Sequence, residues 1–317
     1  MTYDELTFDS DGAACHGWHF SGSGDAFAGP RGRPVVVMAH GLGGTKDSGL
    51  EPFAARLAAA GLDVLAFDYR GFGASAGTPR QTVSMAGQLT DYRAAMAAAA
   101  ALPGVDPDRI VLWGVSLAGG HVLAAGAGRD DVAAVVSLTP LVDGMAAGRH
   151  ALASHSTGSL VRSTAGGVRS KIAVGRGRPA VMMPVVGRPG ELAALSLEGL
   201  YDDYLSLAGP TWRNEVDASV GLELGGHRPG RSAKDLRCPL LVQIADFDRS
   251  APPQAAAKAA FAGRAEVRHY PCDHFDVWPG KEWFEPAVEH QLLFLRRHLA
   301  VGPSDVVSTV DQNENTF

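Results

Sequence analysis

The chain has 317 residues, of which 46% are hydrophobic and 20% charged, and its formal net charge is −6. These values are ordinary for a globular protein and exclude disorder of the whole chain, which requires low hydrophobicity and high net charge. The acidic balance argues against a nucleic-acid-binding protein, which needs a basic face. The length accommodates two domains, or one large α/β domain that carries an insertion.

Short apolar runs alternate with helical segments along most of the chain. An antiparallel hairpin is expected first, at 6–9 and 14–20 around Asp11-Gly12. Runs rich in β-branched residues predict buried strands at 34–39, 63–67, 109–113, 132–138, 239–244 and 265–270. Helices are expected at 50–60 (with Ser48 as its cap), 84–102, 117–127, 252–261 and 286–299. This alternation predicts a mostly parallel, doubly wound α/β sheet.

The alternation stops between residues 141 and 232, where glycine and basic residues are frequent and no clear strand is visible. We expect helices there at 159–174, 191–208 and 214–224. The sequence thus predicts an α/β core made of residues 1–140 and 233–300, an inserted helical lid at 141–232 and a flexible tail at 301–317.

A serine lies on the turn Gly114-Val-Ser116-Leu-Ala118, between a predicted strand and a predicted helix. A nucleophile elbow holds its serine in a strained backbone conformation, so the residues two positions before and after it must be small. Gly114 and Ala118 are both small. The pattern therefore indicates Ser116 as a catalytic nucleophile.

A glycine-rich turn, His40-Gly-Leu42-Gly-Gly44, directly follows the predicted strand 34–39. A serine that attacks a carbonyl group needs N–H donors for the negative charge that develops on the carbonyl oxygen. We expect the backbone N–H groups of Leu42 and Leu117 to form this oxyanion hole.

Two loops near the end of the chain offer an acid and a base. A serine hydroxyl becomes a good nucleophile when a histidine accepts its proton, and the histidine needs a carboxylate to orient it. His274 follows the strand 265–270, and Asp248 follows the strand 239–244. Asp246 and Asp276 are alternative acids. Asp248 is preferred because a position inside the loop can turn back toward Ser116.

Other site classes have little support in the sequence. The segment 71–77 resembles a dinucleotide-binding loop but has no acidic residue at the expected distance. Metal-binding and P-loop motifs are absent, so we expect no cofactor and no metal. We predict a cytoplasmic protein, because the sequence has three cysteines, no visible secretory signal and no long apolar run.

Together the motifs at 40–47, 67–73 and 113–116 resemble those of the α/β-hydrolase superfamily. Residues 44–47 and 274–276 are similar to a group that includes fungal polyketide transferases and uncharacterised bacterial serine hydrolases, related to dienelactone-hydrolase-like and serine-aminopeptidase-like proteins. The resemblance implies an α/β-hydrolase fold with an inserted lid, and acyl transfer through a serine ester. Ser116 departs from the cysteine of true dienelactone hydrolases and from the aspartate of haloalkane dehalogenases and epoxide hydrolases.

We therefore predict a serine hydrolase that cleaves a carboxylic ester, or a thioester or amide, through an acyl-serine intermediate. Two alternatives stay open. One is an acyltransferase of secondary metabolism that passes an acyl or polyketide chain to an alcohol, and the other is a ligand-binding protein on a hydrolase fold that does not turn over. The expected partner is a small acyl substrate, with no nucleic acid and no membrane, and a dimer is one option for the oligomeric state.

Overall fold

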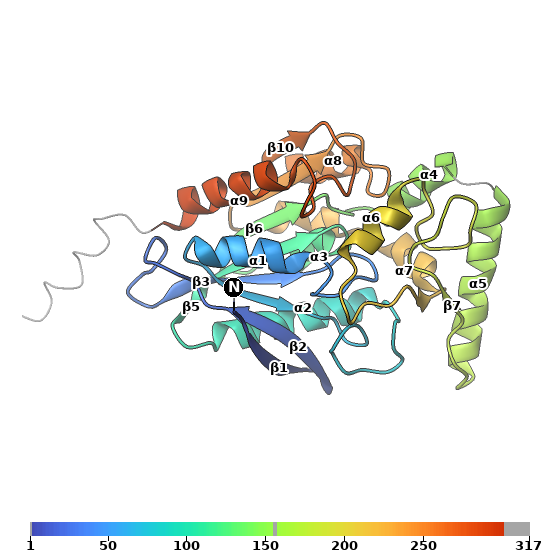
Figure 1. The fold of residues 1–317 in the computed structure, drawn as a ribbon, viewed down its shortest axis with the longest axis horizontal. Helices are drawn as coiled ribbons and strands as arrows, with labels where there is room; N and C mark the ends of the chain where they lie inside the picture. The colour runs from blue at the N-terminus through green and yellow to red at the C-terminus, as the bar shows by residue number, and fades with distance from the viewer. Residues whose placement is uncertain (1, 155–156, 301–317) are drawn as a thin grey trace, which may run out of the picture.

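A computed structural model describes the backbone of residues 2–154 and 157–300, and their side chains except those of 151–161. Its centre is an eight-stranded sheet with the order β1-β2-β4-β3-β5-β6-β9-β10 (Figure 1). The strands are β1 Asp4–Ser10, β2 Ala13–Phe20, β3 Arg33–Ala39, β4 Asp63–Phe67, β5 Val105–Val115, β6 Val132–Leu138, β9 Leu240–Ala245 and β10 Glu266–Tyr270. Within this sheet the β1/β2 and β2/β4 pairs are antiparallel and the other described strand pairs are parallel. The predicted parallel sheet and its edge hairpin are confirmed.

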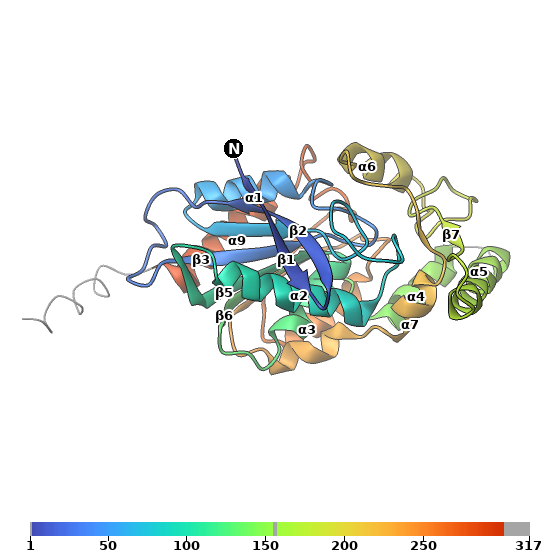
Figure 2. The ribbon, with the colours of Figure 1, turned by 90° about the horizontal axis from the view of Figure 1, so that it is seen from below.

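Helices cover both faces of the sheet. They are α1 Leu50–Ala59, α2 Met85–Ala100, α3 Leu117–Gly126, α8 Pro253–Ala262 and α9 Phe284–Leu299. Figure 2 shows α1 and α9 on one face and α2 and α3 on the other. The predicted cap of the first helix is wrong: Gly49, at φ 77°, precedes α1, and the Ser48 hydroxyl hydrogen-bonds Thr45 instead. Ser84 does cap α2, because its side chain accepts the Gly87 N–H.

The segment 141–232 contributes no strand to the large sheet among its described residues. It forms helices α4 Gly144–Ser154, α5 Thr157–Gly175, α6 Leu200–Leu207 and α7 Val220–Gly226, two short paired strands β7 Met182–Met183 and β8 Val216–Asp217, and the start of a 3-10 helix at Pro229–Asp235. Helix α4 and the strand pair were not predicted. The helix expected at 191–208 begins only at Leu200, because Gly199 adopts a positive φ angle of 83° that interrupts a helix.

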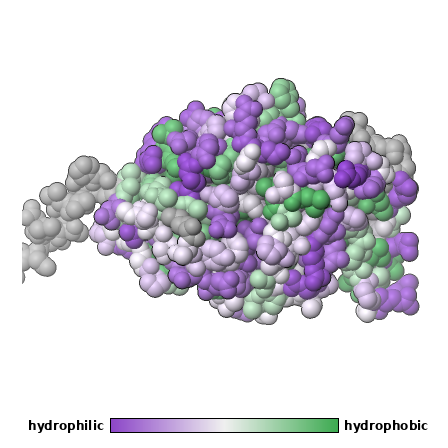
Figure 3. Space-filling view, viewed as in Figure 1, coloured by the Kyte–Doolittle hydropathy of each residue, from purple (hydrophilic) through white to green (hydrophobic). Residues whose placement is uncertain are grey.

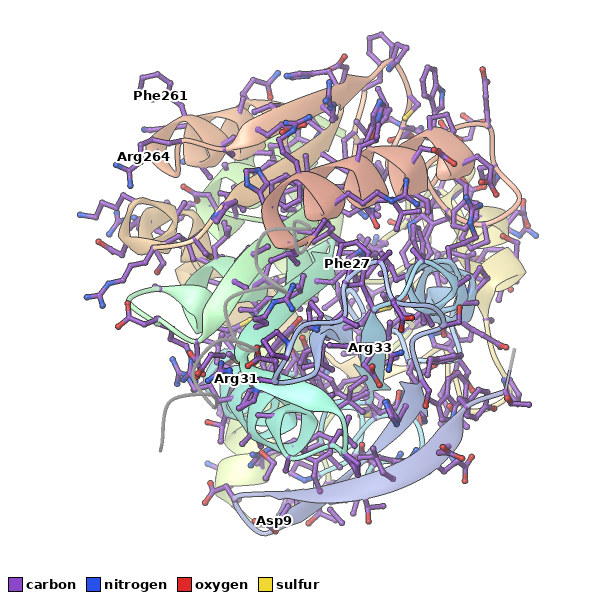
Figure 4. The ribbon with its side chains drawn as sticks, turned by 90° about the vertical axis from the view of Figure 1, so that its left-hand side faces the viewer. Asp9, Phe27, Arg31, Arg33, Phe261 and Arg264 are labelled. Atoms are coloured by element: carbon purple, nitrogen blue, oxygen red, sulfur yellow. The ribbon has the colours of Figure 1, made fainter. Side chains whose placement is uncertain are left out.

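The two ends of the sheet differ in what covers them. Helices α4 to α7 lie beyond the right-hand end of the sheet in Figure 1. Figure 4 faces the opposite end, where Arg31 pairs with Asp106 at 2.5 Å and with Asp108 at 2.7 Å. In Figure 3 hydrophobic residues are scattered over this face, and some of them lie over the insertion at the right. In the insertion, Val168 and Ile172 of α5 are about half exposed. No described helix is both long and apolar enough to cross a bilayer. The expected tail at 301–317 lies outside the described residues.

Candidate active site

Ser116 connects the end of β5 to the start of α3, at φ 58° and ψ −117°. A positive φ is uncommon for a residue other than glycine, and such strain is concentrated at functional sites. The turn is also tight, because a Cβ atom on Gly114 would lie 2.2 Å from the Ala118 carbonyl oxygen. The Ser116 N–H donates to the Leu138 carbonyl at 2.9 Å, which secures the turn to β6. The backbone thus holds this serine in the geometry that the sequence predicts for a nucleophile elbow.

His274, on the loop after β10, is paired with Asp248, on the loop after β9. The distance from His274 Nδ1 to Asp248 Oδ2 is 2.6 Å, and both residues are 3% exposed. The other carboxylate oxygen of Asp248 accepts the backbone N–H groups of Ser250 and Ala251 at 2.8 and 2.6 Å. Burial lowers the pKa of His274, but the charge and hydrogen bond of Asp248 raise it by more, so this pKa lies above its ordinary value.

The other two candidate acids lie elsewhere. Asp246 Oδ1 is 2.6 Å from Nδ1 of His269, and this contact is solvent-exposed. Asp276 Oδ2 accepts the backbone N–H of Asp273 at 2.9 Å. Of the three candidate acids, Asp248 is therefore the one whose carboxylate contacts the imidazole ring of His274.

The glycine-rich turn after β3 presents the Leu42 backbone beside Ser116. A Cβ atom on Gly41 would lie 2.9 Å from the Ser116 Cβ atom, so only glycine allows this approach. The buried ring of His40 donates from Nδ1 to the Gly41 carbonyl at 2.9 Å, which fixes the peptide plane that carries the Leu42 N–H. Burial lowers the pKa of His40, so the ring stays neutral. The Leu117 N–H follows Ser116 at the start of α3, as an oxyanion hole requires.

A buried ion pair fixes the far end of this turn. Lys46 Nζ lies 2.6 Å from Asp68 Oδ2, and the Lys46 backbone N–H donates to Asp68 Oδ1 at 2.6 Å. The Ala74 N–H also donates to Asp68, and a Cβ atom on Gly73 would lie 2.2 Å from the Asp68 carboxylate. The glycine-rich segment 71–77, which resembles a dinucleotide-binding loop in sequence, therefore wraps around a carboxylate of this chain.

Ser116, His274 and Leu42 line one pocket. Most of its remaining wall is apolar and includes Leu141, Leu195, Tyr204, Leu207, Phe275 and Trp278. The structure thus brings the predicted serine, base and first oxyanion residue together, although no hydrogen bond joins Ser116 to His274 among the described contacts. The apolar wall was not predicted, because no motif marks these residues. Within the described part of the chain, no cluster of three or more His, Cys, Asp or Glu side chains could hold a metal.

Comparisons with known proteins bear on the family and the fold. The family described as "alpha/beta hydrolase fold" matches residues 34–281. The quorum-quenching protein AidA of Acinetobacter baumannii is 35% identical over 300 residues, which are 94% of this chain and 95% of AidA. The polyketide transferase grgF of Penicillium sp. is 34% identical over 133 residues, 42% of this chain and 43% of that protein. The crystal structure of the alpha/beta hydrolase GrgF from Penicillium sp. sh18 has a TM-score of 0.76 at 22% identity and covers 94% of this chain and 99% of its own.

Proposed function

The chain belongs to the α/β-hydrolase fold family, and from that membership and the site geometry we propose that it is a serine hydrolase that cleaves carboxylic esters through an acyl-serine intermediate. The observation that carries the proposal is the shared pocket: a strained serine and a buried, carboxylate-paired histidine line one apolar cavity. The apolar wall suits an acyl chain, because burying its methylene groups is favourable.

In the first half of the reaction, the Ser116 hydroxyl attacks the ester carbonyl carbon while Nε2 of His274 accepts the hydroxyl proton. Asp248 holds Nδ1, so the neutral ring presents the unprotonated Nε2 toward the serine, and the carboxylate stabilises the imidazolium that forms. The Leu42 and Leu117 N–H groups bind the negatively charged oxygen. The leaving alcohol takes the proton from His274, which leaves the acyl group on Ser116.

In the second half, a water molecule enters where the alcohol left. His274 removes a proton from this water as its oxygen attacks the acyl carbon, and the same proton then returns to Ser116 as the carboxylic acid departs. The segment 141–232 supplies pocket residues such as Leu195 and Leu207 but none of these proton-transfer groups. We propose that it is the lid and that it determines which acyl chains fit.

The same intermediate would also serve an acyltransferase, if an alcohol rather than water accepts the acyl group. The name of the Penicillium relative, a polyketide transferase, supports this second candidate. Thioesters and amides are further candidate substrates. The name of the A. baumannii relative, a quorum-quenching protein, adds a quorum signal as a further candidate substrate. The three cysteines are free thiols, which favours a reducing compartment, and we propose the cytoplasm.

The proposal is tested by stopped-flow kinetics on p-nitrophenyl esters of two to twelve acyl carbons. We expect a burst of nitrophenol that approaches one equivalent, followed by slower turnover, because p-nitrophenol is a good leaving group and makes acylation of the serine faster than hydrolysis of the acyl-enzyme. Adding methanol should divert part of the acyl group to the methyl ester, and a clear preference for an alcohol over water would favour the transferase. Ser116→Ala should abolish the burst. Binding without any turnover would instead indicate a ligand-binding protein.

A further inference from the structure

The oxyanion loop, residues 40–44, places Leu42 between two glycines. Gly43 has a φ of 64°, a conformation that glycine adopts at little cost. Glycines on both sides leave the neighbouring peptide planes free to rotate unless hydrogen bonds hold them. Inside the loop, His40 Nδ1 and the Gly44 N–H, the latter at 3.3 Å, both donate to the Gly41 carbonyl, which shares its peptide plane with the Leu42 N–H. The next two peptide planes, which carry the Leu42 and Gly43 carbonyls, take their side-chain partners from outside the loop.

Three consecutive carbonyl groups of the oxyanion loop each accept a side-chain hydrogen bond. His40 Nδ1 binds the Gly41 carbonyl at 2.9 Å, as described above. The Tyr204 hydroxyl donates to the Leu42 carbonyl at 2.6 Å, and Trp212 Nε1 donates to the Gly43 carbonyl at 3.0 Å. Two of the three donors therefore come from the insertion, more than 160 residues further along the chain.

The segment that carries these donors is attached to the loop and to the core. The Thr211 N–H donates to Asp47 Oδ2 at 2.9 Å, one residue beyond the buried Lys46. At the start of α6, Asp203 pairs with Lys281 of the core at 2.7 Å. The sequence motif 44–47 thus has two structural tasks: its lysine binds the core, and its aspartate binds the insertion.

Tyr204 is suited to hold a fixed position. Its side chain is 8% exposed, and its ring lies 5.3 Å from the ring of Trp212 and 5.7 Å from that of Phe275, the residue after His274. Burial raises the pKa of the Tyr204 hydroxyl, so it remains a neutral donor at any pH at which the protein works. One side chain therefore contacts both the oxyanion loop and the loop that carries His274.

We propose that Tyr204 and Trp212 are positioning residues for the oxyanion hole, so that the hole reaches its working geometry only when segment 200–212 of the insertion is seated on the oxyanion loop. This inference rests on the proposed serine hydrolase activity. It gives the insertion a second task besides selecting substrates, because seating this segment holds the two peptide planes that follow the Leu42 N–H.

The test compares Tyr204→Phe and Trp212→Phe with Tyr201→Phe. Tyr201 lies on the same helix, and its ring contacts Arg188 rather than the oxyanion loop. We expect kcat to fall about tenfold in each of the first two variants, a smaller loss than the 10²- to 10³-fold loss in kcat that follows removal of an oxyanion donor itself. KM should change less than about twofold. Tyr201→Phe should match the wild type. Melting temperatures and circular dichroism show whether each variant folds.

A boronic acid adds a readout that general loosening of the fold would not produce. Butylboronic acid forms a tetrahedral adduct with a reactive serine and places an oxygen in the oxyanion hole, whereas butyrate, the product of a butyryl ester, forms no such adduct. We expect the inhibition constant of the boronic acid to rise about tenfold in Tyr204→Phe, and that of butyrate to stay unchanged. If one phenylalanine variant unfolds, the other carries the same comparison.

The outcomes separate this inference from the proposed function. An active wild type whose two folded phenylalanine variants keep full kcat and boronic acid affinity would overturn the positioning role and leave the hydrolase proposal standing. Equal losses of affinity for butyrate and for the boronic acid in both variants would likewise overturn the positioning role and leave the hydrolase proposal standing. A wild type that neither hydrolyses esters nor binds the boronic acid would overturn both.

Discussion

Replacing Asp248 with asparagine changes the chemistry of the proposed acid–base pair while leaving its shape. The asparagine carbonyl can keep the Ser250 and Ala251 N–H groups that one carboxylate oxygen binds at 2.8 and 2.6 Å. Its NH₂ group then faces Nδ1 of His274, where the second oxygen was 2.6 Å away. An NH₂ group donates to Nδ1 and so places the ring proton on Nε2, which can no longer accept the Ser116 proton.

The magnitude follows from this change of tautomer. We expect kcat of Asp248→Asn to fall about 10⁴-fold, or about 5 kcal/mol of transition-state stabilisation. The melting temperature should change little because the backbone contacts of the loop are kept. The assay is kcat on p-nitrophenyl butyrate beside a thermal melt of each variant.

Asp246→Asn is the matched control, two residues away. Its contact with His269 is solvent-exposed, and exposed pairs contribute at most about 1 kcal/mol. We expect its kcat within about twofold of the wild type. The reasoning is refuted if Asp248→Asn keeps more than about a tenth of the activity, or if Asp246→Asn is the inactive variant.

Three further predictions follow from the same geometry. Because His274 must be neutral to act as the base and its pKa lies above the ordinary value, kcat/KM should rise tenfold per pH unit up to a midpoint above about pH 6.5 and then level off. A midpoint below about pH 6 would contradict this. Lys46→Met should lower the free energy of unfolding by about 3 kcal/mol, as measured by urea titration. This is the lower end of the range for a broken buried ion pair, because backbone N–H groups still bind Asp68. A loss under about 1 kcal/mol would be inconsistent with a buried, unpaired charge. Leu195→Ala and Leu207→Ala should shift the ranking of acyl chain lengths in kcat/KM by about 1 to 3 kcal/mol, whereas equal losses on every ester would argue against an acyl-binding wall.

The parts of the fold that could be predicted are those that local sequence determines. The predicted strand 132–138 has the bounds of β6, and the predicted strand 34–39 differs from β3 by one residue, because continuous β-branched runs are buried on both faces of a parallel sheet. The elbow at Ser116 was predictable for a similar reason, since its requirements concern only the residues within two positions.

The insertion could not be predicted equally well, because its structure depends on contacts that are distant in sequence. No local pattern indicates that Tyr204 meets Leu42 or that Lys46 meets Asp68. Within 191–208 the apolar spacing favours a long helix, but Gly199, at φ 83°, stops the helix from extending toward residue 191, so it begins at Leu200. The acid at Asp248, proposed from its place in the loop, remains a prediction until its kinetics are measured.

The central claim is that Ser116 is the nucleophile, and covalent labelling tests it most directly. Trypsin should release residues 110–129 as one peptide in which Ser116 is the only serine, and which contains no threonine, tyrosine or lysine. After reaction with a fluorophosphonate, we expect one label per protein on this peptide, and no label on the Ser116→Ala variant. A label on any other peptide, or equal labelling of Ser116→Ala, would contradict the assignment of the nucleophile.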